Sequence, residues 1–207
     1  MIEEGLFKKF PMEQVFGMHN WPEVEKGKFS ICSGPIMAGA NTIQIKITGS
    51  GGHAAMPHQT IDPIIVGSHI VTALQTVSSR TINPMDNIVL SITQFHAGTT
   101  HNIIPNEVFL EGSLRTLSDS TKETAVKKID EIVKNIAKGF SAEAEFSIDK
   151  GYPVTVNSKK ETEVVSNVAS ELVGNNNVNS SMTPIMGSED FSFMLNVIPG
   201  AYICIGQ

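Results

Sequence analysis

Hydrophobic and polar residues alternate along the middle of the chain, and this alternation predicts four strands. In the segment 42–48, Ile43, Ile45 and Ile47 fall on one face and polar residues fall on the other. Strict alternation of this kind is typical of a half-buried strand. The other three strands are expected at 88–95, 107–115 and 142–148.

Two helices are expected between these strands. Asp62 is suited to cap the first helix and Pro63 to occupy its first turn. The second helix is expected to begin at the capping-box pair Ser120 and Glu123 and to end at Gly139. The apolar stripe of the first helix comprises Val66, Ile70, Ala73, Leu74 and Val77.

The predicted element order of the segment 40–151 is therefore β-α-β-β-α-β. Each strand has one apolar face and each helix has one apolar stripe, so helices packed on one face of an antiparallel sheet would bury all of them. This is the ferredoxin-like arrangement. The sequence thus predicts an α+β domain at 40–151.

The flanking segments 1–39 and 152–207 show a different pattern. They predict a short strand ending at His19 and a helix at 158–173. The run 201–205 is continuously apolar, as expected of a strand buried on both faces. We expect these pieces to belong to one α/β sheet that the middle domain interrupts, and they contain too little chain to complete such a sheet.

The helix expected at 158–173 has its own end signals. Ser158 and Glu161 are spaced as a second capping box, and Gly174 is placed to stop the helix.

Composition narrows the class of protein. The chain has 207 residues, of which 41% are hydrophobic and 17% charged, which is typical of a folded protein. The net charge of -6 does not favour nucleic acid or an anionic membrane as a partner. Cys32 and Cys204 lie far apart without CxxC spacing, and no apolar run is long enough to span a membrane. A cytoplasmic location is the expectation.

Two segments carry histidines in settings that suit chemistry. His19 is expected at the carboxyl end of a sheet strand, where its imidazole could bind a divalent ion or could be an ordinary hydrogen-bonded loop residue. His53 and His58 lie in the glycine-rich segment 49–58. They could donate hydrogen bonds to a developing oxyanion, or they could simply be exposed in a flexible connection.

Three further positions are candidates for substrate contacts. Asn102 can donate and accept, which suits an amide, although turn chemistry explains an asparagine equally well. Arg115 can grip a carboxylate with two hydrogen bonds or pair with a glutamate across the sheet. The segment starting at Gly187 contains Glu189 and Asp190, which can favour a helix start or act near a metal.

These segments, taken in order, resemble one family. The matching stretches are FGMHNWP, GSGGHAAMPH, DPI, THNIIPNEVFLEGSLRT and MGSEDFSFML. They are similar to the aminoacylase-like two-metal metallopeptidases, in the branch of hippurate hydrolase, N-acyl-L-amino acid amidohydrolase and the auxin-conjugate hydrolases. The likeness covers almost the whole chain, and several motifs in fixed order are more specific than any one alone.

The resemblance implies a fold and a chemistry. Residues 1–39 and 152–207 would be part of a two-metal catalytic domain, and 40–151 would be an inserted ferredoxin-like lid that forms a homodimer. Zinc or manganese, two ions per site, would activate water against the amide of an N-acyl amino acid. His19 would be a metal ligand and His53 the catalytic oxyanion donor, while Asn102, Arg115 and Gly187 would bind substrate.

The sequence departs from the family pattern in its metal ligands. The branch usually carries a His-Ala-Cys-Gly-His-Asp segment and a Glu-Glu pair before the region matched here, and a further histidine after it. Glu3 and Glu4 lie where relatives have the helix that follows the true pair. Of roughly five ligands implied for two ions, the sequence supplies only His19.

Three readings of function follow. The first is a truncated N-acyl amino acid amidohydrolase that is inactive as this chain alone. The second is a non-catalytic dimerisation or ligand-binding module derived from that family. The third, a metal-independent hydrolase with His53 or His19 as base, ranks last because no serine or cysteine has the setting of a nucleophile.

Overall fold

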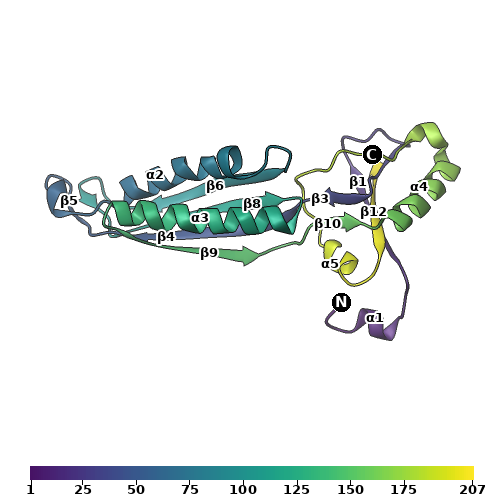
Figure 1. The fold of residues 1–207 in the computed structure, drawn as a ribbon, viewed down its shortest axis with the longest axis horizontal. Coiled ribbons are helices and arrows are strands. Elements are labelled where there is room, and N and C mark those ends of the chain that lie inside the picture. The colour runs from purple at the N-terminus through teal and green to yellow at the C-terminus, as the bar shows by residue number, and fades with distance from the viewer. The chain divides into compact units, whose positions relative to one another are not determined.

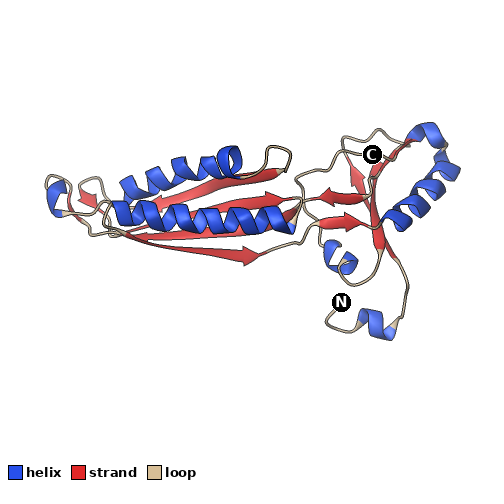
Figure 2. Cartoon of the chain, viewed as in Figure 1, coloured by secondary structure: helices blue, strands red, loops and turns tan.

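The computed structural model describes all 207 residues, which form two compact units. The middle unit is Ala40–Gly151, and the flanking unit combines Met1–Gly39 with Tyr152–Gln207. Helices and strands occur in both (Figure 2), and the mixed α/β fold predicted from the sequence is confirmed. None of the helices is both long and apolar enough to cross a membrane.

The middle unit is built on a four-stranded sheet in the order β6-β8-β4-β9. β4 pairs antiparallel with β9, and β6 pairs antiparallel with β8 with a bulge between Ile92 and Gln94. Numbered along the chain, the strand order is 2-3-1-4, which together with the β-α-β-β-α-β succession is the ferredoxin-like arrangement. The bounds are β4 Gly39–Thr48, β6 Ile88–Ala97, β8 Glu107–Thr116 and β9 Glu143–Lys150.

Both long helices of the middle unit lie on one face of this sheet (Figure 1). They are α2 (Pro63–Thr76), which continues as a π-helical turn η2 (Val77–Thr81), and α3 (Asp119–Gly139). A single apolar core fills the space between the helices and the sheet, and Ile45, Leu74 and Leu114 are among its buried side chains. The alternation seen in the sequence therefore marks the face that the helices cover.

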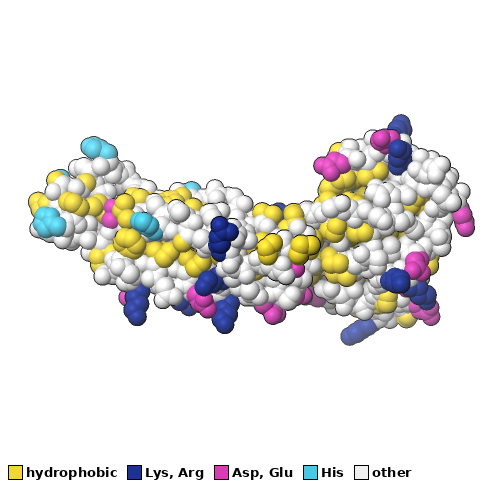
Figure 3. Space-filling model, turned by 45° about the horizontal axis from the view of Figure 1, so that its top comes forward, with side chains coloured by type: hydrophobic (Ala, Val, Ile, Leu, Met, Phe, Trp, Pro, Cys, Tyr) yellow, Lys and Arg dark blue, Asp and Glu magenta, His cyan; other side chains and the backbone are white.

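Two short elements form the tip of the middle unit beyond the main sheet. β5 (Gly52–His53) pairs antiparallel with β7 (Ile103–Ile104), and the 3-10 helix η1 (Pro57–Gln59) follows β5. In Figure 3, histidine side chains gather at the end of the middle unit that carries these elements.

The capping predictions for α2 and α3 have different outcomes. The Asp62 carboxylate accepts a hydrogen bond from the Ile64 N–H at 2.9 Å, which confirms this cap. The prediction for α3 was wrong by two residues, because Ser118 has the extended backbone of a cap and its hydroxyl accepts from the Thr121 N–H at 3.2 Å. The helix therefore begins before the pair Ser120 and Glu123.

The flanking unit has a four-stranded sheet in the order β1-β12-β2-β11. β1 and β12 are parallel, whereas β12 and β2 are antiparallel. A two-stranded sheet of β10 and β3 accompanies it. The bounds are β1 Val15–Trp21, β2 Phe29–Ser30, β3 Gly34–Met37, β10 Thr155–Asn157, β11 Val178–Asn179 and β12 Gly200–Gly206.

β12 is buried on both faces, as its continuous apolar run predicted. Ala201 and Ile203 face one apolar cluster, which includes Ala169 of α4, and Tyr202 and Cys204 face a second cluster. The helices are α1 (Leu6–Lys9), α4 (Lys159–Val173), the 3-10 turn η3 (Asn175–Asn177) and α5 (Ser192–Leu195).

Candidate functional site

The tip of the middle unit brings two of the predicted site segments together. Gly51 has no room for a side chain, because a Cβ there would lie 2.4 Å from the Ile104 carbonyl oxygen. Its N–H donates to the Asn106 Oδ1 at 2.9 Å, and the Ala54 N–H donates to the Asn102 carbonyl at 3.0 Å. The glycine-rich loop is thus fastened to the loop that carries Asn102.

His53 and Asn102 are both exposed at this tip. The His53 Nδ1 accepts a hydrogen bond from the Ala55 N–H at 3.1 Å. The Asn102 Oδ1 accepts one from the Thr100 hydroxyl at 3.1 Å. Each side chain therefore has one polar atom held by a neighbour and another directed to solvent or to a ligand.

Arg115 lies at the other end of the middle unit. It is the ninth residue of β8, half-buried, and opposite Val89 of β6. At roughly 3.3 Å per residue, the eight steps from Glu107 to Arg115 span about 26 Å. Within one copy of the middle unit, the structure does not bring Arg115 to His53 and Asn102.

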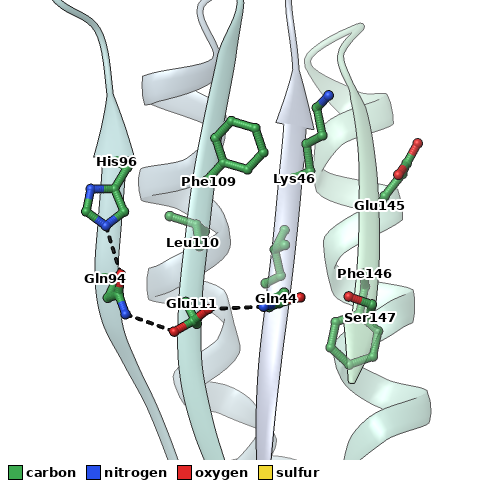
Figure 4. A pocket seen from close by; sticks show the side chains of 11 residues that line it. Gln44, Lys46, Gln94, His96, Phe109, Leu110, Glu111, Glu145, Phe146 and Ser147 are labelled. Carbon is green, nitrogen blue, oxygen red and sulfur yellow. Dashed lines mark hydrogen bonds between the residues drawn. The ribbon is translucent and has the colours of Figure 1, made fainter. Parts of the chain in front are cut away.

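The open face of the middle sheet carries a shallow groove that contains none of the predicted site residues. Figure 4 shows its polar side chains joined in a row across three strands. Gln94 donates to one oxygen of Glu111 at 2.8 Å, and Gln44 donates to the other at 3.1 Å. His96 contacts the Gln94 Oε1 at 2.8 Å. These polar side chains thus form hydrogen bonds with one another on the exposed face of the sheet.

In the flanking unit, His19 lies within the strand β1 rather than at its end. The predicted strand end was wrong because β1 continues in parallel register with β12 to Trp21, so that His19 pairs with Cys204. The imidazole is exposed, its Nδ1 is 2.5 Å from the Asn20 carbonyl oxygen, and its ring meets Trp21 edge-on at 5.9 Å. The Trp21 Nε1 is buried without a hydrogen-bond partner.

Glu189 is the acidic residue that the structure places best for a role near His19. Its Oε2 accepts a hydrogen bond from the Tyr202 hydroxyl at 2.6 Å. Burial alone would raise the pKa of Glu189, but hydrogen bonds from Tyr202, Asp190 and the Phe191 N–H, with the charge of His19, lower the pKa on balance.

The pKa values of the neighbouring Asp190 and Tyr202 are raised instead of lowered. The hydrogen bond to Glu189, followed by burial and the charge of Glu189, raises the pKa of Asp190. Burial and the Glu189 hydrogen bond raise the pKa of Tyr202. The pKa values of the two acids thus shift in opposite directions, and the Tyr202 phenol holds the Glu189 carboxylate.

The sequence did not point to Tyr202, which is the residue that orients Glu189. Asn157 fixes the Tyr202 backbone: its Oδ1 accepts from the Tyr202 N–H at 2.7 Å, and its Nδ2 donates to the Tyr202 carbonyl at 2.9 Å. Gly17 makes room for the ring, because a Cβ there would lie 2.6 Å from Tyr202 Cδ2. A tyrosine inside an apolar strand needs a hydrogen-bond partner for its hydroxyl. The position of Tyr202 in the apolar run 201–205 was therefore the sequence feature that could have indicated its role.

Gly187 does not have the conformation or crowding that would demand glycine. A Cβ there would meet Ile185 at 3.6 Å and Trp21 at 3.8 Å, which are ordinary contacts. Its carbonyl accepts a hydrogen bond at 2.8 Å from the N–H of Ala38, the residue that follows β3.

The residues of this chain do not by themselves fit a two-metal centre. No group of three or more His, Cys, Asp and Glu side chains lies close enough together to hold a metal ion. Protein zinc sites use three or four protein ligands. His19 therefore does not form such a set with Glu189 and Asp190.

Comparison with known proteins places these features in a family. Hippurate hydrolase of Campylobacter jejuni is 38% identical over 98% of this chain and 53% of its own length. N-acyl-L-amino acid amidohydrolase of Geobacillus stearothermophilus is 44% identical over 76% of this chain and 42% of its own length. This chain therefore spans about half the length of the curated relatives it matches.

A solved structure of similar fold supports the same family. The YXEP protein of Bacillus subtilis, a dinuclear metal binding peptidase from the M20 family, matches with a TM-score of 0.82 and 28% identity, over 99% of this chain and 50% of that one. The model of "Peptidase family M20/M25/M40" matches residues 1–207. The resemblance found in the sequence motifs is thereby confirmed, and the chain belongs to peptidase family M20/M25/M40.

Proposed function

We propose that this chain is part of a metal-dependent amidohydrolase that acts on N-acyl amino acids. The observation that carries the proposal is the family match over residues 1–207, which includes every segment that supplies a candidate site residue. Relatives named hippurate hydrolase and N-acyl-L-amino acid amidohydrolase support the substrate class.

The proposed roles follow from the chemistry of each side chain. His53 is the catalytic residue of this chain and donates a hydrogen bond to the oxyanion that forms at the amide carbon. Asn102 holds the amide, and Arg115 binds the carboxylate of the amino acid through two parallel hydrogen bonds. Gly187 contributes backbone to the pocket wall, and the middle unit acts as the lid.

The proposed cofactor is a pair of divalent ions, zinc or manganese. When bound, such ions polarise the amide carbonyl and activate water. His19 is the ligand that this chain would contribute, and the dinuclear metal site named for the YXEP protein supports the assignment. Because the chain lacks a cluster of three ligands, we propose that it does not turn over substrate alone.

The proposed assembly is a homodimer formed through the middle unit. A small substrate cannot span the roughly 26 Å of β8 that separate Arg115 from the tip, so a site using both ends draws them from different copies. β6 is an edge strand of the sheet and exposes Val89 and Phe95, and an unpaired apolar edge favours pairing with a second chain. Light scattering at micromolar concentration should give twice 22.3 kDa, and a monomer would contradict the assembly.

Binding of hippurate to the purified chain tests the substrate assignment without requiring turnover. We expect amide shift changes in NMR spectra around Asn102 and Arg115, and loss of binding in Arg115→Ala. The matched control is Arg80→Ala, because Arg80 is exposed and donates only to the adjacent Ser79 carbonyl. Equal binding by the two arginine variants would contradict the role of Arg115.

The second candidate is a non-catalytic dimerisation or ligand-binding module, which the absence of a three-ligand cluster favours. Both candidate functions can be tested by assaying the release of benzoate or acetate from N-acyl amino acids with added zinc, manganese or cobalt. Turnover by this chain would contradict our proposal that it is inactive alone. A dimer that binds no N-acyl amino acid would favour the module.

A further inference from the structure

The hydrogen bond at His53 determines where its ring carries a proton. The Ala55 N–H donates to Nδ1 at 3.1 Å. A nitrogen that accepts a hydrogen bond has no hydrogen of its own, so the neutral ring carries its hydrogen on Nε2. The exposed Nε2 is therefore a donor and not an acceptor.

The hydrogen bond at Asn102 determines which end of its amide is presented. The Thr100 hydroxyl donates to Oδ1 at 3.1 Å. This bond holds Oδ1 toward Thr100 and leaves the two hydrogens of Nδ2 for a ligand. Without Thr100, the amide could rotate and present either end.

The backbone on which these donors lie is itself fixed. His53 pairs with Ile103 in the β5–β7 ladder, and the Ala54 N–H donates to the Asn102 carbonyl at 3.0 Å. The loop of Thr100 cannot shift independently of the loop of His53, because these bonds join them. The orientation of both side chains thus depends on one small frame.

We propose that Thr100 is a positioning residue and that, with the Ala55 N–H, it sets His53 and Asn102 as a donor pair, in which each side chain presents an N–H group to a ligand. Such a pair recognises acceptor atoms, the carbonyl or carboxylate oxygens of a ligand. The inference rests on the proposed function for its ligand class, but the orientation of the two side chains belongs to the free protein.

The tautomer of His53 can be read directly in the free chain. Long-range nitrogen–proton NMR spectra at pH 8 should show hydrogen on Nε2 and a bare Nδ1. Ala55→Pro removes the donor and should produce a mixture of tautomers, whereas Ala55→Gly keeps the N–H and should not. Hydrogen on Nδ1 in the unaltered protein would overturn the inference, and this measurement stands even if Ala55→Pro fails to fold.

The role of Thr100 is tested by Thr100→Val, which keeps the shape but loses the hydroxyl, and by Thr100→Ser, which keeps the hydroxyl. We expect Thr100→Val to shift the side-chain amide signals of Asn102 and to weaken hippurate binding by about three- to ten-fold, the worth of one hydrogen bond. Thr100→Ser should restore both. Unchanged Asn102 signals in Thr100→Val would overturn the positioning role.

The two proposals fail in distinguishable ways. If no N-acyl amino acid binds but His53 and Asn102 keep the stated orientations, the substrate class is wrong and the donor pair stands. If hippurate binds while the His53 tautomer or the Asn102 signals differ from expectation, the proposed function stands and the donor pair is wrong.

Discussion

The two units of this chain bury their apolar residues in different ways. The middle unit has one continuous core between its helices and its sheet. The flanking unit has two separate clusters on either side of β12, and its outer elements leave apolar residues uncovered. Phe16 and Met18 of β1 and Leu172 of α4 are exposed. Large exposed apolar surface marks interaction sites, and the middle unit has such residues too, among them Val89 and Phe95 of β6. The clearest difference between the two units is therefore the continuity of their cores.

The stability of each unit can be followed separately. The single tryptophan, Trp21, and both tyrosines, Tyr152 and Tyr202, belong to the flanking unit, so intrinsic fluorescence reports on that unit alone. The longest helix, α3, and the helix α2 belong to the middle unit, so helical circular dichroism reports mainly on it. The following changes are ordered from the largest expected effect to the smallest.

Truncating matched leucines should give the largest contrast. Leu114→Ala removes a fully buried side chain from the middle core and should lower the free energy of unfolding of that unit by about 2–5 kcal/mol. Leu172→Ala removes a side chain that is 74% exposed and should change the flanking unit by no more than about 0.5 kcal/mol. Urea titrations read by circular dichroism and by fluorescence measure the two effects. Similar losses would mean that α4 is covered in solution.

Gly17→Ala should destabilise the flanking unit only. The added Cβ would meet Tyr202 at 2.6 Å and Phe191 at 3.2 Å, and overpacking of this kind costs about 1–3 kcal/mol. The fluorescence transition should move to lower urea while the dichroism transition stays. Gly139→Ala, at the end of α3 where nothing lies within 4 Å, is the control and should not weaken the middle unit. A neutral Gly17→Ala would show that the Tyr202 ring is free to move.

Alkaline pH should weaken the flanking unit through its buried thiols. Burial, with a smaller contribution from Cys32, raises the pKa of Cys204 from 9.0 to about 11. A pKa raised by folding contributes stability that is fully present below the unfolded value and is lost as pH rises toward the folded value. The fluorescence-detected stability should therefore fall between about pH 9 and pH 11.

Cys204→Ala supplies the control for this loss. It should make the decline between about pH 9 and pH 11 shallower, because one of the two thiols whose pKa is raised is gone. The middle unit contains no cysteine and should lack this contribution. An equal slope in the variant would mean that other groups cause the alkaline loss.

The same contrast explains what could be predicted from the sequence. In the middle unit, local periodicity and burial agree, since residues such as Ile43 alternate on a face that the unit itself covers. The order of the helices and strands in the middle unit could therefore be predicted from the sequence. In the flanking unit the short strands β2, β3, β10 and β11 were missed, because two to four residues carry no periodic signal.

The candidate site was predictable only in part. The segments of His53 and Asn102 could be named from motifs, and their meeting at the tip depends on the long-range pairing of β5 with β7. The Tyr202–Glu189 hydrogen bond joins a strand residue to a residue of the loop before α5, and no local pattern encodes it. The roughly 26 Å between Arg115 and the tip follows from strand length, so it could have been calculated once β8 was predicted.

The smallest contrast concerns two serines at helix starts. Ser118 caps α3 through its hydroxyl, so Ser118→Ala should cost the middle unit about 1 kcal/mol. Ser158 precedes α4 without a side-chain capping bond, and Glu161, expected to complete a capping box, accepts from Gln14 instead at 2.7 Å. Ser158→Ala should therefore be nearly neutral in the fluorescence-detected transition. A loss as large as that of Ser118→Ala would show that Ser158 caps α4 in solution, and the difference between the two units would then not extend to their helix ends.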